Sequence, residues 1–258
     1  MTERAPAKIN VCLFLGPQRP DGRHELVTIF QPVALYDELT LEPAERDEVV
    51  CEGVEGPNLV AAAVAAFRAQ TGFAEPVRIT ISKRIPVAGG MAGGSADAAA
   101  ALRLLARHSG LDADLHALAE RLGADVPGQI APARYLATGA GERLEPLAPV
   151  APYGVLVLPG PEPLSTGAVF AKAAAMGLRR SRESLDALRH DVRIPNDLPD
   201  ELAHNDLAPA ALALMPEIGE RMQQARAAGA DHVLLSGSGP TVLGLFNDPA
   251  AAGTVSTL

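Results

Sequence analysis

The sequence is poor in cysteine and in aromatic residues. Its 258 residues include two cysteines and no tryptophan, and aromatic side chains make up 3% of the chain. Cys12 and Cys51 lie in apolar stretches, with neither a second thiol nor a histidine at metal-ligand spacing. We therefore interpret both as packing residues, and the sequence predicts no disulfide and no cysteine-held metal. Alanine, leucine and valine must build most of the core.

Positive charge is also scarce. The chain has 22 Lys and Arg against 31 Asp and Glu, a formal net charge of −9. Nucleic-acid backbones require clustered Lys and Arg, so nucleic acid is not expected as a partner. No apolar run approaches the roughly 18 residues of a membrane span, and Met1–Asn10 has no apolar segment of signal-peptide length. The sequence therefore predicts a cytoplasmic protein without a membrane partner.

Length and composition favour two domains. A chain of 258 residues with 48% hydrophobic content can bury a substantial core, either as one large domain or as two modest ones. Prolines and small residues accumulate between Gly141 and Pro152, and a new alternation of strands and helices begins at Gly154. We place the boundary near residue 148, which predicts domains at 1–148 and 149–258.

Hydrophobic periodicity and turn residues predict the secondary structure. Strands are expected at 9–15, 26–35, 38–41, 77–85, 154–158, 233–235 and 241–246, and helices at 59–71, 95–108, 113–122, 166–175, 207–214 and 217–227. Asn58 is expected to cap the helix at 59–71, and Gly72 to end it.

The stretch Pro86–Asp97 is the most informative part of the chain. It follows a predicted strand, contains four glycines and runs into a helix start. Glycines let backbone N–H groups approach an anion, and the helix start adds a favourable dipole, so the pattern predicts a phosphate-binding loop. It lacks the lysine of a P-loop and the G-x-G-x-x-G order of a dinucleotide fold. The alternative is a plain strand-to-helix turn.

Two polar residues at this helix start have ordinary explanations as well as functional ones. The hydroxyl of Ser95 could contact a phosphate or reach a magnesium ion, or Ser95 could serve as the N-cap. Asp97 is expected in the first helical turn, where the helix dipole accounts for it, and we do not assign it to a metal.

Lys8 and Asp125 have the form of a phosphoryl-transfer pair, provided that folding brings them together. Taken singly, Lys8 is a solvated charge at a strand edge, and Asp125 is a turn residue at a helix-flanking bend. Together, a carboxylate could orient a hydroxyl and accept its proton, while a cation keeps the carboxylate ionised. Sequence spacing does not show this contact.

Three further segments fit either a local structural role or a role in ligand binding. Ser236–Pro240, between two predicted strands, is a tight hairpin or a ligand loop. His24 is either a surface-loop histidine or part of a ligand-binding site. Asn205 and Asp206 precede a predicted helix and have the pattern of a simple cap.

Taken in chain order, these segments resemble the GHMP kinase superfamily and, within it, the branch that phosphorylates diphosphocytidyl-methylerythritol. The resemblance spans most of the chain and is carried by Ala5–Asn10, Arg19–Leu26, Lys83–Pro86 with the glycine loop, Leu122–Pro127, Ala137–Arg143, Asn205–Leu207 and Ser236–Thr241. Within the superfamily, the segment Arg19–Leu26 restricts the resemblance to the branch with a cytidyl substrate. The resemblance implies an α+β fold of two domains, the first like ribosomal protein S5 and the second ferredoxin-like, with the active site in a cleft between them.

The resemblance also implies the reaction. ATP and Mg²⁺ would serve to phosphorylate the 2-hydroxyl of a small molecule that carries a cytidine diphosphate, in non-mevalonate (MEP pathway) isoprenoid biosynthesis. The enzyme would be a monomer or a homodimer.

The resemblance further assigns roles to residues. Asp125 matches the catalytic base and Lys8 its partner. The ATP positions are Asn58 near the adenine, together with Pro86, Gly89, Gly90, Met91, Ala92, Gly93, Gly94 and Ser95. The substrate positions are Asn10 beside the acceptor alcohol, Arg23, His24 on the cytosine, Thr166 and Phe170 in the cytidine pocket, and Ser238 and Gly239 at the phosphate end. No metal ligand is assigned beyond the possible role of Ser95.

Two departures from the family pattern bear on the substrate. Arg23 stands where the family usually has an aromatic residue, so cytosine would lie between a guanidinium and Phe170. Gly128–Arg134 replaces the apolar aromatics and Gly-Gly pair that commonly follow Pro127. The alternatives are therefore a kinase for homoserine or a mevalonate-like acid, and a nucleotide-binding protein without turnover.

Overall fold

The computed structural model describes residues 1–54, 56–192, 203–251 and 253–258. The chain forms two compact units that are interleaved along the sequence. The first unit comprises Met1–Ala7, Leu35–Ile85 and Ala92–Pro132, and the second comprises Lys8–Ala34, Pro86–Met91 and Ala133–Leu258. Two long strands, β1 (Thr2–Gln18) and β2 (His24–Pro43), therefore contribute residues to both units.

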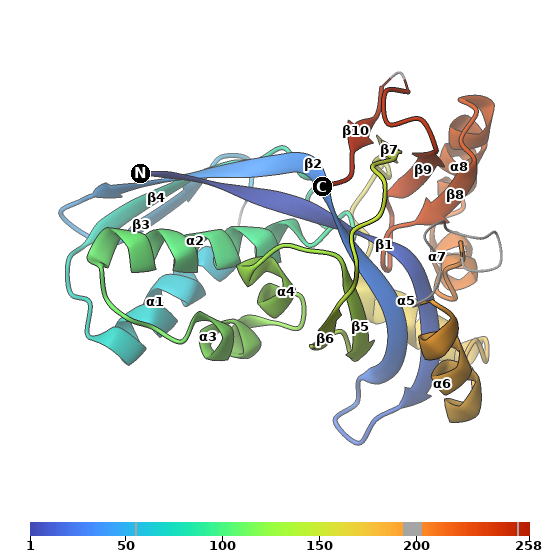
Figure 1. Ribbon diagram of the computed structural model, residues 1–258, viewed down its shortest axis with the longest axis horizontal. Helices are drawn as coiled ribbons and strands as arrows, with labels where there is room; N and C mark the ends of the chain where they lie inside the picture. Colours follow the sequence, from blue (N-terminus) through green and yellow to red (C-terminus); the bar gives the residue numbers. More distant parts are fainter. Residues whose placement is uncertain (55, 193–202, 252) are drawn as a thin grey trace. The chain divides into compact units, whose positions relative to one another are not determined.

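The first unit is a sheet covered by helices. Strand β3 (Glu48–Cys51) pairs in parallel with β4 (Val77–Ser82), and β4 pairs antiparallel with the second half of β2. The helices of this unit lie on one face of that sheet (Figure 1), and they are α1 (Leu59–Thr71), α2 (Gly93–Ser109), α3 (Leu115–Leu122) and α4 (Val126–Ile130).

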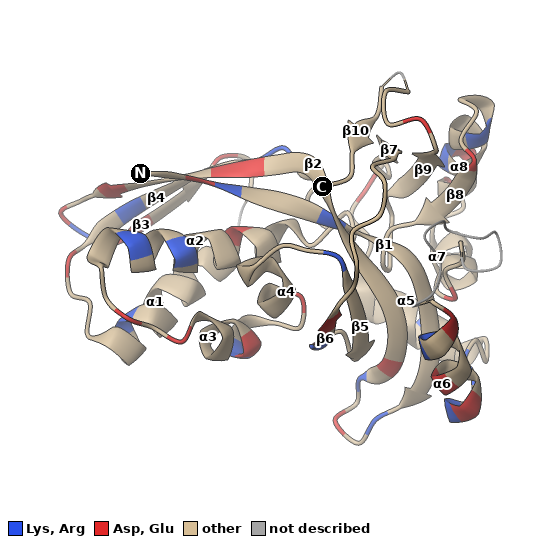
Figure 2. Cartoon of the chain, viewed as in Figure 1, with Lys and Arg blue, Asp and Glu red and all other residues tan. Residues whose placement is uncertain are grey.

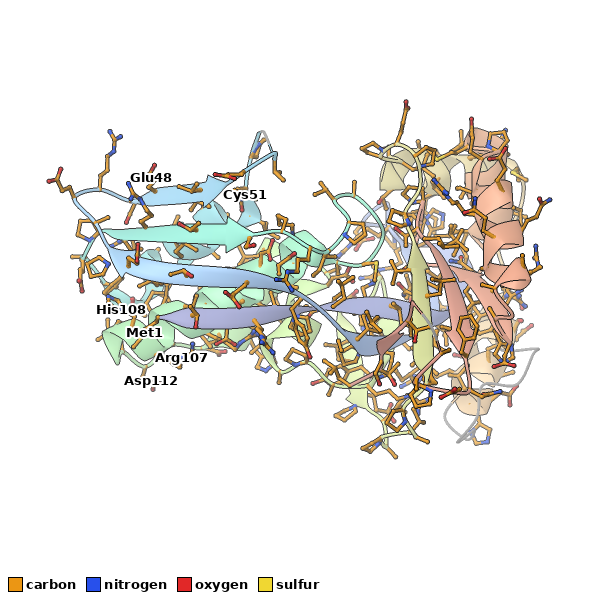
Figure 3. The ribbon with its side chains drawn as sticks, turned by 90° about the horizontal axis from the view of Figure 1, so that it is seen from above. Met1, Glu48, Cys51, Arg107, His108 and Asp112 are labelled. Carbon is orange, nitrogen blue, oxygen red and sulfur yellow. The ribbon has the colours of Figure 1, made fainter. Side chains whose placement is uncertain are left out.

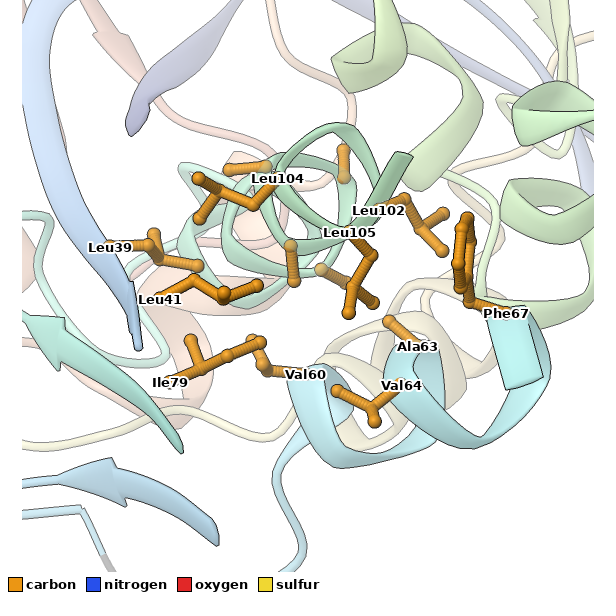
Figure 4. Packing of buried hydrophobic residues seen from close by; sticks show 14 of the residues in the cluster. Leu39, Leu41, Val60, Ala63, Val64, Phe67, Ile79, Leu102, Leu104 and Leu105 are labelled. Carbon is orange, nitrogen blue, oxygen red and sulfur yellow. The ribbon is translucent and has the colours of Figure 1, made fainter. Parts of the chain in front are cut away.

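Helix α2 is held in place by its small buried side chains. Alanines 98–101 are fully buried, and Leu102 and Leu105 pack toward Phe67 of α1 and toward the sheet residues Leu41 and Ile79 (Figure 4). Alanine leaves the backbone of a helix close to its neighbours, and a close-packed interior resists displacement. The start of α2, which continues the glycine loop, therefore rests on the core of the first unit.

The second unit contains two groups of strands. The first half of β2 pairs antiparallel with β5 (Tyr135–Gly139), and β5 pairs with β6 (Arg143–Pro146). A separate antiparallel sheet has the order β10 (Val255–Ser256), β7 (Gly154–Leu158), β9 (Val242–Phe246) and β8 (His232–Leu235).

The helices of the second unit share one apolar core with strand β1. They are α5 (Thr166–Ala175), α6 (Arg182–Asp191), α7 (Ala208–Leu214) and α8 (Ile218–Ala227). Leu13 and Leu15 of β1 pack with Val169 of α5, Ala211 of α7 and Ala225 of α8. One face of α5 is therefore fixed by apolar burial.

Most predicted elements are confirmed to within a few residues. The oxygen of Asn58 accepts the Val60 N–H at 2.9 Å to cap α1, and Gly72 ends that helix at φ +73°. The predicted strands 26–35 and 38–41 are wrong as two elements, because β2 is continuous through Asp37. Strands β3, β5, β6 and β10 and helices α4 and α6 are additional to the predicted elements.

The charged side chains of each unit mix the two signs (Figure 2). In the first unit, Met1 at the start of the chain lies near Arg107 and His108 at the end of α2 (Figure 3). The Arg107 guanidinium donates to the Thr2 carbonyl at 3.1 Å and lies 2.5 Å from the Glu3 carboxylate. None of the helices in the described ranges is long and apolar enough to cross a bilayer.

Candidate active site

Two glycine-rich loops meet in the second unit. The Ser236 hydroxyl donates to the Gly90 carbonyl at 2.9 Å. Gly90 has φ +74°, and a Cβ at this position would lie 2.1 Å from the Ser236 carbonyl oxygen. Only glycine fits such a site, because a side chain meets both backbone strain and a fixed carbonyl.

The segment Ser236–Pro240 is the turn that connects β8 to β9. The Ser236 N–H donates to the Thr241 carbonyl at 2.9 Å, as in a closed hairpin. The hairpin prediction is therefore confirmed, and the same turn also supports the glycine loop.

Lys8 lies beside this glycine loop rather than in solvent. Its backbone N–H donates to the Met91 carbonyl at 3.2 Å, and the residue is only 7% exposed. The ammonium donates to Asn10 Oδ1 at 2.9 Å and lies 4.3 Å from the centroid of the Phe30 ring. The expectation of a solvated strand-edge lysine is wrong, because a partner amide and an aromatic face compensate the burial.

Asn10 is held in a single orientation. Its side-chain nitrogen donates to Thr28 Oγ1 at 2.7 Å, while its oxygen accepts from Lys8. A Cβ at Gly237 would lie 3.3 Å from that same oxygen. Lys8, Asn10 and the turn at Gly237 therefore converge on the Pro86–Met91 part of the loop within the second unit.

The other part of the glycine loop starts α2 in the first unit. Ala92 is the N-cap residue at φ +56°, so Ser95 is the third helical residue and the prediction of Ser95 as N-cap is wrong. Among the described residues, no atom lies within 4 Å of a Cβ built at Gly94. Backbone N–H groups at an open helix start bind anions, so this end of α2 fits a phosphate.

A buried ion cluster supports the start of α2. The Lys83 ammonium contacts the Asp37 carboxylate and lies 2.7 Å from Asp97 Oδ2. The other oxygen of Asp37 accepts the backbone N–H groups of Arg84 at 2.6 Å and Ile85 at 2.9 Å. Lys83 Nζ also lies 3.2 Å from the position of a Cβ at Gly93. The cluster thus joins β2, the end of β4 and α2 next to the glycine-rich turn that starts α2.

Asp97 is a structural carboxylate with an unusual proton affinity. It is the fifth residue of α2 and 4% exposed, so its explanation by the helix dipole of the first turn is wrong. Burial raises the pKa of Asp97 to about 7, and the Lys83 ammonium opposes that rise.

Asp125 occupies the bend that the sequence predicts. It is the half-buried residue before α4, and the following Val126 N–H donates to the Gly123 carbonyl at 3.2 Å. Asp125 and Asn58 belong to the first unit, whereas Lys8 belongs to the second. The meeting of Lys8 and Asp125 therefore stays a prediction.

A cavity of about 470 Å³ opens in the second unit between the β1–β2 turn and α5. It is lined by Gln18, Gly22, Arg23, His24, Leu26, Ala140, Thr166, Gly167, Phe170, Ala171 and Ala174. The His24 ring stacks on Phe170 with centroids 5.5 Å apart and an interplanar angle of 30°. His24 is 8% exposed, so its interpretation as a surface-loop histidine is wrong. Burial, with a smaller contribution from Arg179, lowers the pKa of His24, which keeps the imidazole neutral at pH 7.

One hydrogen bond joins this cavity to the glycine loops. The hydroxyls of Thr166 and Ser238 lie 2.9 Å apart, with either as donor. Ser238 belongs to the same turn whose Ser236 holds Gly90. The cavity and the glycine loop are thus linked through this turn within the second unit.

Asn205 and Asp206 do more than cap a helix. The Asn205 oxygen accepts the Leu207 N–H at 2.8 Å, as a cap would, but its nitrogen donates to the carbonyls of Leu235 at 2.8 Å and Gly237 at 2.7 Å. Asp206 accepts from the Leu15 backbone at 2.9 Å and from the Arg180 guanidinium at 2.6 Å. The pair therefore ties the Ser236–Pro240 turn to strand β1.

The described residues include no group of three or more His, Cys, Asp or Glu side chains that could hold a metal by themselves. A metal held largely by a bound nucleotide needs few protein ligands, and the hydroxyl of Ser95 in α2 is the donor that the sequence indicates.

Comparison with known proteins agrees with this arrangement. Residues 58–133 match the family model of the GHMP kinases N terminal domain, and residues 183–257 match that of the GHMP kinases C terminal. A Streptomyces avermitilis protein named 4-diphosphocytidyl-2-C-methyl-D-erythritol kinase is 39% identical over 99% of this chain and 91% of its own length.

Two solved structures show the same architecture. A crystal structure of 4-(cytidine 5'-diphospho)-2C-methyl-D-erythritol kinase superposes with a TM-score of 0.82 and 33% identity, covering 100% of this chain and 99% of that one. A homoserine kinase from Cytophaga hutchinsonii, at 18% identity, has a TM-score of 0.67 over 98% of this chain and 86% of that one, which reflects the fold alone.

The predicted two-domain fold is confirmed by these matches. The boundary near residue 148 stays a prediction, because the two compact units are interleaved while the two matched regions follow one another along the chain. With two family regions in order and a relative 39% identical over nearly its whole length, the chain belongs to the GHMP kinase superfamily.

Proposed function

We propose that this protein is an ATP-dependent kinase for the 2-hydroxyl of 4-diphosphocytidyl-2-C-methyl-D-erythritol, a step of non-mevalonate isoprenoid biosynthesis. The observation that carries the proposal is the link within one unit between a cavity of about 470 Å³, large enough to admit a nucleoside, and a glycine loop, through the hydroxyls of Thr166 and Ser238. A substrate with a cytidine at one end and an alcohol at the other matches such a site. The name of the Streptomyces avermitilis relative, similar over nearly the whole chain, supports the same substrate.

The cytidine is proposed to bind in the cavity of the second unit. Phe170 offers an aromatic face, His24 a neutral imidazole that can exchange hydrogen bonds with the base edge, and Arg23 a guanidinium that can stack on the other face. Ser238 and Gly239 would then border the diphosphate, because their turn lies between the cavity and the loop.

ATP is proposed to bind along the glycine loop. The open start of α2 at Gly93, Gly94 and Ser95 suits the phosphates, while Pro86–Ala92 form the rest of the cradle. Asn58, whose oxygen is used in capping α1, would present its nitrogen toward the adenine. Mg²⁺, when bound with ATP, would neutralise phosphate charge, with the Ser95 hydroxyl as its candidate protein donor.

The proposed reaction is a direct in-line transfer. Asp125 accepts the proton of the 2-hydroxyl, the hydroxyl oxygen forms a bond to the γ-phosphorus, and the bond from that phosphorus to the β–γ bridging oxygen breaks to release ADP. Lys8, held by Asn10 beside the loop, stabilises the negative charge around the transferred group. Most of the acceleration comes from positioning, and no phosphoenzyme forms. A cytoplasmic location, where ATP is available, agrees with this reaction.

Release of ADP with three acceptors tests the proposal. The wild-type protein should turn over the cytidyl-methylerythritol substrate and should be competitively inhibited by cytidine diphosphate, with no comparable turnover of homoserine or mevalonate. Turnover of either of those two alcohols without cytidine inhibition would refute the substrate. ATP binding without ADP release for any acceptor would refute the activity.

A further inference from the structure

The two turns at the mouth of the cavity lie outside the apolar core. The β1–β2 turn contributes Gln18, Gly22 and Arg23 to the lining, and the β5–β6 turn contributes Ala140. Gln18 and Arg23 are exposed and Ala140 is half-buried. On the other side of the cavity, α5 is anchored in the core by Val169 and Ala173, which are fully buried. One wall of the cavity is therefore fixed by packing, and the other must be fixed by polar contacts.

A run of charged side chains connects these two turns. The Arg19 guanidinium donates to Glu142 at 2.8 Å and lies 3.2 Å from the Asp21 carboxylate. Asp21 in turn accepts from Arg23 Nε at 3.1 Å and Nη2 at 3.0 Å. Two carboxylates and two guanidiniums thus alternate along the run, which leaves it electrically neutral.

Both carboxylates of the run are anchored to backbone. The Asp21 carboxylate accepts the Arg23 N–H at 3.1 Å, and the Glu142 carboxylate accepts the Ala140 N–H at 2.6 Å. Burial acts to raise the pKa of Glu142, but the hydrogen bond from Arg19, the backbone N–H donors and the charge of Arg19 together outweigh it, and the pKa ends below its usual range. The pairs are therefore ionised at neutral pH.

We propose that the run Glu142–Arg19–Asp21–Arg23 positions the mouth of the cytidine pocket, with Arg19 as the positioning residue and the Arg23 guanidinium as the wall it sets in place. The inference rests on the proposed function. Arg19 touches neither the cavity nor the reacting groups, so it acts through Arg23 and Ala140. A guanidinium that is already ordered loses less conformational entropy when a base stacks on it. The free-energy cost of binding the cytidyl end of the substrate is therefore lower.

Steady-state kinetics with Arg19→Met test the inference. The KM for the cytidyl substrate should rise about 1.5- to fivefold, the range expected for loss of a surface ion pair that is part-buried, while kcat and the KM for ATP stay unchanged. The difference between the variant and the wild type should shrink in about 0.5 M salt, which screens exposed charges. Arg19→Lys, which keeps the charge but not the fork of donors, should recover part of the loss.

Three further variants keep the inference falsifiable if Arg19→Met folds poorly. Glu142→Gln removes the charge with little change in shape and should give the same rise in KM. Exchange of the pair, Arg19→Glu with Glu142→Arg, should restore part of the affinity. Arg78→Met, the control, breaks an exposed ion pair with Glu48 in the first unit and should leave every constant unchanged.

The outcomes separate this inference from the proposed function. If the wild-type protein does not phosphorylate the cytidyl substrate, the proposed function is wrong and the inference falls with it. If it does, but Arg19→Met and Glu142→Gln keep the wild-type KM at an unchanged melting temperature, the positioning role alone is wrong. A fall in kcat and melting temperature with no selective change in KM would equally overturn it, because that result indicates a general structural role.

Discussion

Replacing Gly90 with alanine should lower the stability of the protein and damage the proposed ATP site. Gly90 has φ +74°, where an L-residue costs about 1–2 kcal/mol. The new Cβ would lie 2.1 Å from the Ser236 carbonyl oxygen, and ordinary contact begins at 3.4 Å, so the loop must retreat by 3.4 − 2.1 = 1.3 Å. That retreat breaks the hydrogen bond from the Ser236 hydroxyl, which contributes about 1 kcal/mol. The free energy of unfolding should fall by about 2–3 kcal/mol in total.

The kinetic effect follows from the displacement. A shift of about 1 Å in a positioning element can cost about a hundredfold in rate, so kcat/KM for ATP should fall by that order. Urea denaturation measures the stability, and an ADP-release assay at saturating acceptor measures kcat/KM.

Two other glycines provide controls. Gly72 has φ +73° at the end of α1, with no described atom within 4 Å of a Cβ, so Gly72→Ala isolates the backbone strain. Gly94→Ala meets neither strain nor contact and should leave stability unchanged or slightly improved, yet raise the KM for ATP if phosphate occupies that space. The reasoning is refuted if Gly90→Ala is no less stable than Gly72→Ala and retains wild-type kinetics with ATP.

Three shorter tests concern single ionisable groups. Asp125→Asn should reduce kcat by about a hundredfold or more, the usual contribution of a general base, while the Kd for ATP measured by calorimetry stays nearly the same; unchanged turnover would remove Asp125 from the mechanism. Burial raises the pKa of Asp97 to about 7, so the folded protein binds more protons than the unfolded chain and its stability should decrease as pH rises from about 4 to 7. Asp97→Asn should flatten that decrease in urea titrations, and an identical slope in the variant would contradict the assignment. Because the pKa of His24 is lowered, the KM for the cytidyl substrate should be constant near pH 7 and rise only below pH 6.5, as the ring protonates; His24→Gln should abolish the rise, and its persistence in that variant would exclude His24 as the titrating group.

Elements with strong local signals could be predicted from the sequence. Helix α1 carries its own start and stop signals, a capping Asn58 and a left-handed Gly72, so its bounds follow without knowledge of the rest of the fold. The glycine loop and the helix after it are local in the same sense. The start of α2 still lies two residues before the expected Ser95, because Ala92 adopts the left-handed cap conformation that local propensity does not favour.

The sequence-based predictions were wrong for charged residues whose surroundings are formed by residues distant in the sequence. Asp37 interrupts an apolar run and resembles a strand end, but Lys83 pairs with it and lets β2 continue through a buried position. Lys8 resembles a surface residue until Phe30 and Asn10 enclose it. One sequence gives no sign of these partners, because they come together only in the folded sheet.

The cavity shows the same limit for the candidate site. Arg19 and Glu142 lie 123 positions apart, and both belong to segments that carry the family resemblance, yet nothing local indicates that they touch. Their segments could be singled out in advance. The ion pair between Arg19 and Glu142 could be identified only from the structure.

The shared strands restrict how this enzyme can be recombined with its relatives. Leu13 and Leu15 of β1 pack against α5, α7 and α8, so a fragment that begins near residue 149 would lack a side of its own core. The cavity likewise takes residues from distant segments of the chain, from Gln18 to Ala174. A chimaera with a single crossover between these segments would separate the β1–β2 turn from α5, and transfer of the cavity between homologues must therefore carry residues 8–34 together with the C-terminal half.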